Sequence, residues 1–379
     1  MRILYVASDQ VVPGHTGGSV HVLEVARGLA ARGHEVHAVV RAQDGAPDRE
    51  ERFGVVWHRV RWWPPHRLFR FRAKKRVEAV ASQARPQVVM ERYYNFGGEG
   101  ILAAASLGVP SLLEVNSPVV DHPGSLKAAL DRAAIVRPLR RYREGLCRKA
   151  TAIVSPLLEV VPEFARPRTH RVTWGANVEA FAPARRDEAE RRALGVPEGA
   201  VVAVFSGSFR PWHGVHVLEE AARTLAASHP ELFFLFVGGE GGPGRGYRGR
   251  RLGPVPYERM PLVVAASDLG VAPYDTRRLR QLRLGFYWSP LKIFEYMASG
   301  LPTVTIGRAP LGEIVRDGQE GLHFAEADAP DLARALARLA GDPDLRRRLG
   351  ANARARVVER YSWSRHCEQL ESVLGGLLS

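Results

Sequence analysis

The stretch SPLKIFEYMASGLP, residues 289–302, has the residues of a short helix with marked ends. Ser289 is a good N-cap, Pro290 suits the first helical position, and Gly300 suits the left-handed position just beyond the end. Lys292 would then lie in the first turn, where the helix dipole disfavours a cation. An anion docked on this end would remove the conflict, because the lysine and the unpaired amides would both bind it. The alternative is an ordinary surface pair between Lys292 and Glu295, which is three residues further on.

Strand-like apolar runs and helical patterns alternate along the first half of the chain. The expected strands are ILYVA, EVHAVV, VVWHRV, QVVMER, SLLEV and AIVSP. Helices are expected between several of them, at 19–32, 98–107 and 125–149. Such alternation predicts a mostly parallel sheet covered by helices on both faces.

The same pattern restarts in the second half. VVAVFSGS (201–208) is followed by an expected helix at 214–228 and by strands at 232–239, 269–274, 302–306 and 321–324. The segment 343–377 is expected to be helical throughout. The sequence therefore predicts two doubly wound α/β domains, whose ligands we expect in a cleft at the carboxyl ends of the strands.

Composition excludes several classes of protein. The 379 residues are 45% hydrophobic and 25% charged, as in globular domains, and Cys147 and Cys367 have no metal-like spacing. No apolar run is long enough for a membrane-spanning helix. The apolar run at the N-terminus is also too short for a signal peptide, so we expect a cytoplasmic protein. The net charge of +14 invites a nucleic-acid partner, but arginine makes up most of the basic residues along the whole chain, and we expect none.

Two loops occupy equivalent places, each after a strand and before a helix. HTGGSVHV (15–22) brings Gly17 and Gly18 to a helix start, where a ligand could approach the backbone. GSFRPWHG (207–214) brings Arg210 and His213, which could face a diphosphate. The alternatives are a tight turn in the first loop and solvated side chains in the second.

Polar residues also follow the expected strand SLLEV. EVNSPVVDH (114–122) offers Glu114, Asn116, Asp121 and His122, of which His122 could act as a base or be merely structural. GDPD (341–344) contains a D-x-D, but Asp342 fits a helix N-cap better than a metal ligand. No metal is expected.

The segment VRWWPPHRLFRFRAKKRVEAV (60–80) mixes aromatic and basic residues. This composition suits peripheral contact with an anionic bilayer. The alternatives are an ordinary amphipathic helix with a solvated basic face, and stacking on nucleic acid, for which no RNA-binding motif appears.

In order and spacing, these pieces resemble a retaining glycosyltransferase of the GT-B fold, family 4, over nearly the whole chain. GGSVHV with ARGHEV (31–36) resembles the N-terminal signature, and FSGSFRPWHGVHVLEEA (205–221) resembles the loop that grips the donor diphosphate. SPLKIFEYMASGLPTVT with GEIVRDGQEGL (312–322) resembles the C-terminal motif. The resemblance implies an acceptor-binding Rossmann-like domain at 1–170, a nucleotide-sugar-binding one at 171–355, and a C-terminal helix at 356–379 that packs back on the first.

The resemblance also implies roles for individual residues. Glu295 would bind the ribose of a nucleotide sugar, and the helix start with Ser289, Leu291 and Lys292 would hold its phosphates. The resemblance implies further donor contacts at Gly17, Gly18, Val255 and Tyr287. On the acceptor side it implies His21, Glu114 and His122. The catalytic residues that it implies are Arg210, His213, Lys292 and Asn116.

Some positions depart from the family pattern. Tyr287 stands where many members have a glutamate that contacts the transferred sugar. His213 replaces a phosphate-binding lysine, and Asn116 replaces a histidine near the reacting sugar. Ser208 stands in place of an arginine, for which Arg210 could substitute. These departures put the donor sugar in question.

The expected activity is transfer of a sugar from a nucleoside-diphosphate donor, UDP by family frequency, to a hydroxyl acceptor. The acceptor could be lipid-linked or anionic, as in cell-surface polysaccharide assembly. The resemblance implies no cofactor. The alternatives are a GT-B sugar-nucleotide epimerase or hydrolase, and a non-catalytic binder of nucleotide sugars or polyanions.

Overall fold

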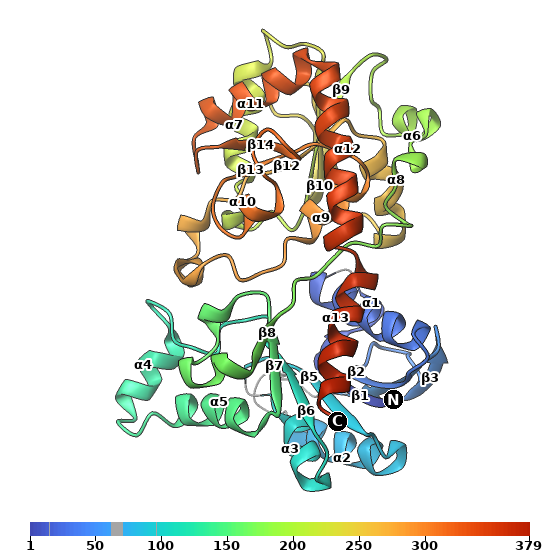
Figure 1. Cartoon of the computed structure of the whole chain (residues 1–379). Coiled ribbons are helices and arrows are strands. Elements are labelled where there is room, and N and C mark those ends of the chain that lie inside the picture. The colour runs from blue at the N-terminus through green and yellow to red at the C-terminus, as the bar shows by residue number, and fades with distance from the viewer. Residues whose placement is uncertain (15, 62–70, 96) are drawn as a thin grey trace. The chain divides into compact units, whose positions relative to one another are not determined.

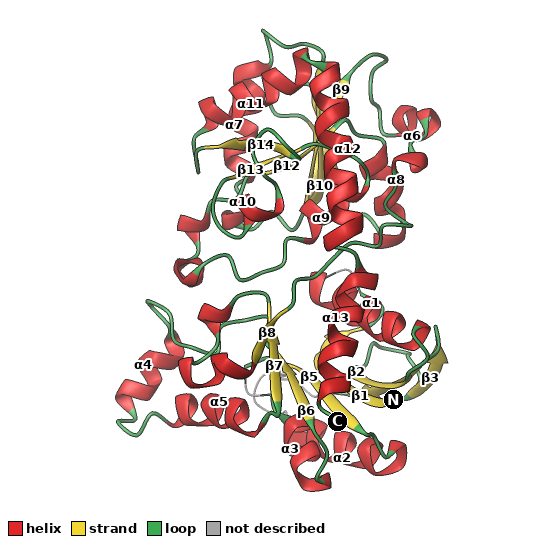
Figure 2. Cartoon of the chain, viewed as in Figure 1, coloured by secondary structure: helices red, strands yellow, loops and turns green. Residues whose placement is uncertain are grey.

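The computed structural model describes residues 1–14, 16–61, 71–95 and 97–379, which form two compact α/β units (Figure 1). The first unit consists of Met1–Trp174, Tyr287–Ser289 and Trp363–Ser379, and the second of Gly175–Phe286 and Pro290–Ser362. Each unit has one sheet with helices around it, as Figure 2 shows. The prediction of two mainly parallel α/β domains is confirmed.

The sheet of the first unit has eight strands in the order β3-β4-β2-β1-β5-β6-β7-β8. Among these strands, β3 and β4 pair antiparallel and every other neighbouring pair is parallel. The strands are β1 Arg2–Val11, β2 Glu35–Arg41, β3 Arg49–Arg52, β4 Val55–Val60, β5 Val88–Arg92, β6 Ser111–Glu114, β7 Ala152–Ser155 and β8 Thr169–Arg171.

Helices flank this sheet. They are α1 Gly17–Ala31, α2 Phe71–Ala84, α3 Glu99–Leu107, α4 Leu126–Ala133, α5 Pro138–Lys149 and α13 Trp363–Gly376. Leu4 and Val6 of β1 belong to a buried apolar cluster with α2 and α3. Because strand side chains alternate between faces, Tyr5 points to the other face, where its hydroxyl bonds Glu114. The helix α13 packs against α1.

The expected single helix at 125–149 is wrong, because it is two helices, α4 and α5, joined by a tight turn. Ile135 and Arg137 in this turn have positive φ angles of 60° and 52°, which cannot continue a right-handed helix. Pro138 then starts α5, since its fixed φ suits a first helical position.

The sheet of the second unit has six strands, all pairing parallel, in the order β11-β10-β9-β12-β13-β14. The strands are β9 Val201–Ser206, β10 Leu232–Pro243, β11 Gly249–Gly253, β12 Leu269–Ala272, β13 Thr303–Ile306 and β14 Gly321–Phe324. The helices are α6 Glu188–Ala193, α7 Val215–Leu225, α8 Met260–Ala265, α9 Leu291–Ala298, α10 Leu311–Ile314, α11 Ala329–Gly341 and α12 Pro343–Arg360.

Short 3-10 helices connect several of these elements. In the first unit they are Leu158–Val160 and Glu163–Arg168, and in the second Pro183–Arg185, Pro211–His213, Tyr257–Arg259, Thr276–Arg278 and Arg280–Leu284.

The quoted helix at 289–302 begins later than expected. α9 starts at Leu291, and Pro290 precedes it with a non-helical ψ of 76°. Ser289 is therefore not the N-cap, and its hydroxyl instead accepts a hydrogen bond from the Trp174 backbone N–H at 3.2 Å. Gly300 has the predicted positive φ, 72°.

The expectation of continuous helix over 343–377 is also wrong. Asp342 caps α12 as predicted, accepting from the Leu345 N–H. The helix ends at Arg360 because Tyr361 turns out of helical conformation and its carbonyl accepts from the Ala176 N–H at 2.8 Å. Ser362 then bridges to Ala176, and α13 begins at Trp363.

The predicted membrane segment 60–80 lies partly outside the described residues, since its description resumes only at Phe71 with α2. Among the described helices, each is too short or too polar to cross a bilayer.

Candidate functional site

Two buried nitrogen atoms of the second unit converge beside Gly207, the residue that follows β9. A Cβ added to Gly207 would lie 2.8 Å from Nζ of Lys292 and 3.1 Å from Nδ1 of His213. Neither nitrogen has a hydrogen-bond partner in the described part of the chain. Because position 207 has no side chain, its backbone lies close to two potential donors at the carboxyl end of the sheet.

Lys292 is the charged member of this group. It lies in the first turn of α9, is 9% exposed, and burial lowers its pKa to about 7. Its Nζ is 4.2 Å from the centre of the Phe205 ring and 5.3 Å from that of Tyr274. Aromatic faces attract a cation but supply no hydrogen-bond acceptor of normal strength, so the ammonium group is left to bind an anion.

His213 ends the short 3-10 helix Pro211–His213. Burial lowers its pKa to about 2, and the nearby charges of Lys292 and Arg210 act in the same direction. The imidazole is therefore neutral at ordinary pH and can offer one N–H without adding charge. Arg210, three residues earlier, is exposed and supplies a permanent cation on the same loop.

Glu295 lies one turn after Lys292 and is 6% exposed. Burial raises its pKa to about 7, against a hydrogen bond from Tyr257 and the charge of Lys292, which both lower it. The alternative of a solvent-exposed Lys292–Glu295 surface pair is wrong, because both side chains are buried. A buried carboxylate with free oxygen lone pairs is suited to accept hydrogen bonds from ligand hydroxyls.

The end of β9 fixes α9 in place. The Tyr296 hydroxyl accepts a hydrogen bond from the Ser206 backbone N–H at 2.8 Å. Gly270 of β12 allows this, since a Cβ there would lie 2.3 Å from the Tyr296 ring. Lys292 and Glu295 are thus held on a helix that is anchored to two central strands.

The other predicted donor residues are more scattered. Leu291 is the half-buried first residue of α9, and Val255 is half-buried between β11 and the 3-10 helix Tyr257–Arg259. Tyr287 and Ser289 group with the first unit, where Tyr287 is buried with its ring beside Trp288. Within the second unit, the structure therefore brings together Arg210, His213, Lys292 and Glu295.

In the first unit, His21 of α1 and Glu114 of β6 form a fully buried pair. Their Nε2 and Oε1 atoms are 2.6 Å apart, and Tyr5 donates to the other carboxylate oxygen at 2.9 Å. Burial alone would raise the pKa of Glu114, but the charge and hydrogen bond of His21 outweigh it and hold the pKa at about 2. Glu114 is thus an internal anion whose partner is His21.

Trp174 covers this pair. Its ring stacks on His21 with centroids 4.3 Å apart, and its Nε1–H donates to Oδ1 of Asn116 at 3.1 Å. The structure therefore brings three predicted site residues, His21, Glu114 and Asn116, into one buried cluster around Trp174.

His366 of α13 completes a group with His21 and Glu114 in which possible metal-ligating atoms lie within 4.8 Å of one another. Two ligands of a tetrahedral zinc ion are separated by about 3.3 Å. The 2.6 Å between His21 and Glu114 instead fits a direct histidine–carboxylate pair. His366 donates from Nδ1 to the Thr173 carbonyl at 2.8 Å, which ties α13 to this cluster.

The remaining predicted residues of the first unit lie in loops. Gly17 starts α1 after the Thr16 cap, and Gly18 is packed so closely that a Cβ would lie 2.3 Å from Oε1 of Gln10. His122 is half-buried, with its Nδ1 3.1 Å from the Pro123 carbonyl.

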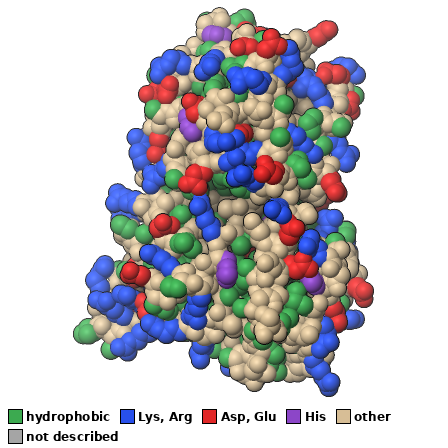
Figure 3. Space-filling model, in the orientation of Figure 1, with side chains coloured by type: hydrophobic (Ala, Val, Ile, Leu, Met, Phe, Trp, Pro, Cys, Tyr) green, Lys and Arg blue, Asp and Glu red, His purple; other side chains and the backbone are tan. Residues whose placement is uncertain are grey.

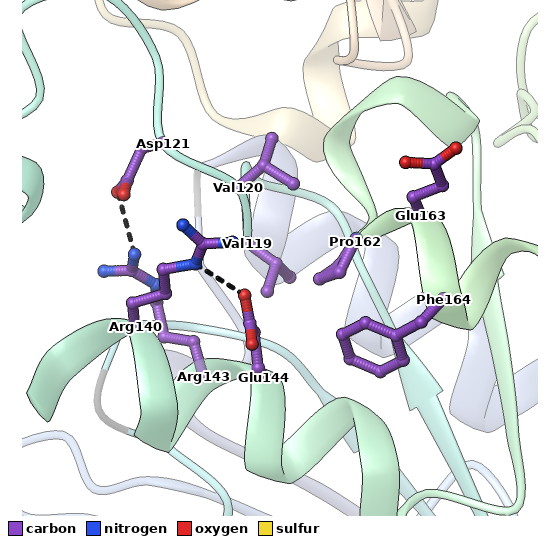
Figure 4. Close-up of a pocket in the computed structure, with 9 residues that line it drawn as sticks. All are labelled: Val119, Val120, Asp121, Arg140, Arg143, Glu144, Pro162, Glu163 and Phe164. Carbon is purple, nitrogen blue, oxygen red and sulfur yellow. Dashed lines mark hydrogen bonds and ion pairs between the residues drawn. The ribbon is translucent and has the colours of Figure 1, made fainter. Parts of the chain in front are cut away.

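A cavity of about 640 Å³ opens between α5 and the loops after β6 and β7 (Figure 4). Arg143 lines it and is almost completely buried, with Nη2 donating to Asp121 at 2.8 Å. Its Nε and Nη1 have no hydrogen-bond partner among the described residues. Arg140 and Glu144, on the same wall, pair with each other at 2.7 Å.

Sequence reasoning missed four of these residues. Gly207 carried an available signal, a glycine directly after a buried strand. Tyr257, Trp174 and Arg143 carried none, because nothing in their local sequence distinguishes them from other aromatic and basic residues.

Comparisons with known proteins find similar proteins over most of the chain. Residues 15–166 match the family model described as Glycosyltransferase Family 4, and residues 200–342 match the one described as Glycosyl transferases group 1. The chain is 30% identical over 407 residues to a D-inositol 3-phosphate glycosyltransferase of Geodermatophilus obscurus, covering 96% of this chain and 85% of the relative. A protein of the same name from Thermobispora bispora is 28% identical, with 96% and 91% covered.

Solved structures also resemble the whole chain. Sucrose-phosphate synthase from Thermosynechococcus elongatus has a TM-score of 0.76 at 20% identity, covering 99% of this chain and 98% of that one. Anabaena HepE in complex with UDP and glucose has a TM-score of 0.72 at 17% identity, covering 99% and 100%.

Proposed function

The chain belongs to glycosyltransferase family 4 and has the GT-B fold, and we propose that it transfers a sugar from a UDP-sugar to a hydroxyl group of an anionic acceptor. We propose further that the configuration at the anomeric carbon is retained. The observation that carries the proposal is the convergence of the Lys292 and His213 nitrogens beside Gly207.

The donor diphosphate would bind beside Gly207. A phosphate oxygen there would accept from the Lys292 ammonium group and the His213 N–H, which otherwise lack partners. Arg210 would supply further positive charge from the exposed side of the loop. Binding would thus satisfy polar groups that are costly to leave buried.

Glu295 would accept hydrogen bonds from the two ribose hydroxyls. The support is its burial one turn from Lys292 and its raised pKa, which the donor's approach as a hydrogen-bond partner would lower again. UDP is favoured because HepE, a structural neighbour, is described in complexes with UDP and with UDP-glucose.

In the proposed reaction the acceptor hydroxyl attacks the anomeric carbon on the face from which the diphosphate leaves. The bond between the anomeric carbon and the diphosphate oxygen breaks, its electron pair goes to the diphosphate, and the hydroxyl proton goes to a phosphate oxygen. Lys292, His213 and Arg210 would stabilise the negative charge that develops on the leaving group. These three groups supply that charge stabilisation without a metal ion.

The acceptor's anionic group would bind in the cavity beside Arg143. The unpaired Nε and Nη1 atoms of its guanidinium can form two charge-assisted hydrogen bonds to a phosphate or carboxylate. Relatives that cover most of this chain are named for D-inositol 3-phosphate, which carries such a group. A lipid-linked or polysaccharide acceptor with a phosphate would present the same chemistry.

Thermal unfolding with UDP, GDP, ADP, dTDP and their sugars tests the donor. A ligand at a hundred times its Kd adds about 2.7 kcal/mol, enough for a shift of several degrees. UDP compounds should stabilise the wild type and not Glu295→Ala. No response to any nucleotide would contradict the proposal, and NMR of the product's anomeric proton would decide retention or inversion.

A further inference from the structure

The hairpin of α4 and α5 carries the most exposed large apolar side chains among the described residues. Ile135 is 85% exposed and Leu126 is 74% exposed, and Leu130 and Val136 are more than half exposed. Leu126 and Leu130 are four residues apart and lie on one face of α4. A group of exposed aliphatic side chains of this kind marks an interaction surface more often than a chance arrangement.

The tip of this hairpin is a defined turn. Ile135, a β-branched residue, has a φ of 60°, where such side chains are rarely found, and Arg137 has a φ of 52°. The buried Asp131 fixes the turn, because its carboxylate accepts from the Leu139 and Arg140 backbone N–H groups at 2.8 and 2.9 Å. The backbone of Ile135 is therefore held in an unfavourable conformation with its side chain exposed, which indicates a use for this exposure.

Positive charge surrounds the apolar tip. Residues 126–149 contain eight basic and two acidic residues. Both acids are engaged, Asp131 in the turn and Glu144 with Arg140 and Arg148. Four exposed cations of the hairpin have no ion pair within the part of the chain that the structure describes: Arg132, Arg137, Arg141 and Lys149. Figure 3 shows blue side chains gathered over α4 and α5 at the lower left, with green ones between them.

We propose that the α4–α5 hairpin docks the protein on an anionic lipid bilayer. Ile135 and Val136 would insert among the headgroups, with Leu126 and Leu130 at the boundary. The arginines would lie against lipid phosphates. Aliphatic side chains ringed by cations match the two attractions of such a surface, apolar burial and negative surface potential.

Other partners fit less well. A second copy of the chain would bring the same basic surface against itself, where like charges repel. Proteins that bind single-stranded nucleic acid combine cations with aromatic rings on which the bases stack. The hairpin's Tyr142 has its hydroxyl bonded to the Gly97 carbonyl, and the exposed tip is aliphatic.

Vesicle sedimentation without nucleotide tests the proposal independently of transfer activity. The full chain should pellet with vesicles of phosphatidylcholine and phosphatidylglycerol, not with phosphatidylcholine alone, and less at high salt. Ile135→Asn with Val136→Ser should weaken binding at least tenfold. Folding should be preserved, because asparagine tolerates the positive φ of position 135. Arg137→Gln with Arg141→Gln should weaken it about 25-fold, or roughly fivefold for each charge removed.

Matched controls lie in the second unit. Val358→Ser replaces an exposed apolar residue of α12, and Arg185→Gln replaces an exposed arginine, and neither should change vesicle binding. A fluorescent probe on Ile135→Cys should shift to the blue with anionic vesicles, while one on Val358→Cys should not; both native cysteines are buried.

Three results would overturn the proposal. The first is equal binding by wild type and both hairpin variants, and the second is no preference for anionic vesicles. The third is a wild-type protein that does not bind vesicles but either self-associates or binds RNA, in a way that the hairpin variants abolish.

Discussion

The amine of Lys292 lies 4.2 Å from the centre of the Phe205 ring and has no hydrogen-bond partner among the described residues. The ring offsets part of the cost of burying the charge, but less than an anion would. The ligand-free protein thus has a buried ionisable amine, with a pKa lowered to about 7, at the position proposed for the diphosphate.

Replacing Lys292 with methionine should separate activity from stability. Lys292→Met should lower kcat about 100- to 1,000-fold, because a donor to the developing negative charge is lost. The melting temperature should stay the same or rise, because an unpaired buried cation is removed. Initial rates and thermal unfolding on one preparation check both, with the exposed Lys75→Met as reference. Unchanged turnover would remove Lys292 from the mechanism.

The contribution of Lys292 and Glu295 to the stability of the ligand-free protein should have its minimum near pH 7. From the ordinary carboxylate pKa up to about 7, native Glu295 keeps a proton that the unfolded chain has lost, so the free energy of unfolding falls as pH rises. From about 7 up to the ordinary lysine pKa, the unfolded chain keeps a proton that native Lys292 has lost, so this free energy rises. Urea unfolding between pH 5 and 9, compared with a Lys292→Met/Glu295→Gln variant, checks it. A pH-independent difference would contradict these pKa values.

Nucleotide binding should be accompanied by proton uptake on the alkaline side of neutrality. At about pH 8 the ligand-free Lys292 is largely neutral, since its pKa is about 7. A bound diphosphate favours the charged amine and draws a proton from the buffer. Calorimetric titration of UDP in two buffers of different ionisation enthalpy measures this uptake, which should disappear in Lys292→Met. Identical heats in both buffers would argue against a titrating lysine.

A side chain at position 207 should block the diphosphate site. Gly207→Ala should lower UDP affinity at least tenfold, because its Cβ would lie 2.8 Å from Nζ of Lys292. The φ of 154° adds strain of about 1 to 3 kcal/mol. Gly242→Ala is the control, since Gly242 has a similar φ of 140° and open space around it. If both variants bind UDP equally well, the diphosphate does not lie beside Gly207.

Arg143 should distinguish acceptors by charge. If the proposed anionic acceptor is a phosphate such as inositol phosphate, Arg143→Met should raise its KM about tenfold or more, since charge-assisted hydrogen bonds are lost. Any transfer to unphosphorylated inositol should be unchanged. The exposed Arg148→Met, on the same helix, should affect neither. An equal loss with both acceptors would show that Arg143 supports the cavity wall and does not recognise an anion.

Some features of α9 and of the α4–α5 turn could be predicted from the sequence, and others could not. Gly300 predicted the end of α9, and the position of Lys292 in its first turn predicted an anion site, because helix ends and dipoles are local properties. The burial of both side chains could not be predicted, because it depends on β9 and β12, which are distant in sequence. The turn between α4 and α5 was missed although Pro138 was a usable signal for a helix start. No sequence signal indicated the positive φ of Ile135, since β-branched residues avoid that region.

The first unit contains chain segments that the ribosome synthesises at widely different times. α13 packs on α1, where the Sγ of Cys367 lies so close to Gly28 that a Cβ there would be 2.4 Å from it. The whole of the second unit is synthesised before α13 emerges from the ribosome. The face of α1 that α13 covers therefore stays exposed until the second unit has been synthesised. A nascent chain arrested before Trp363 is the form most exposed to proteases and chaperones.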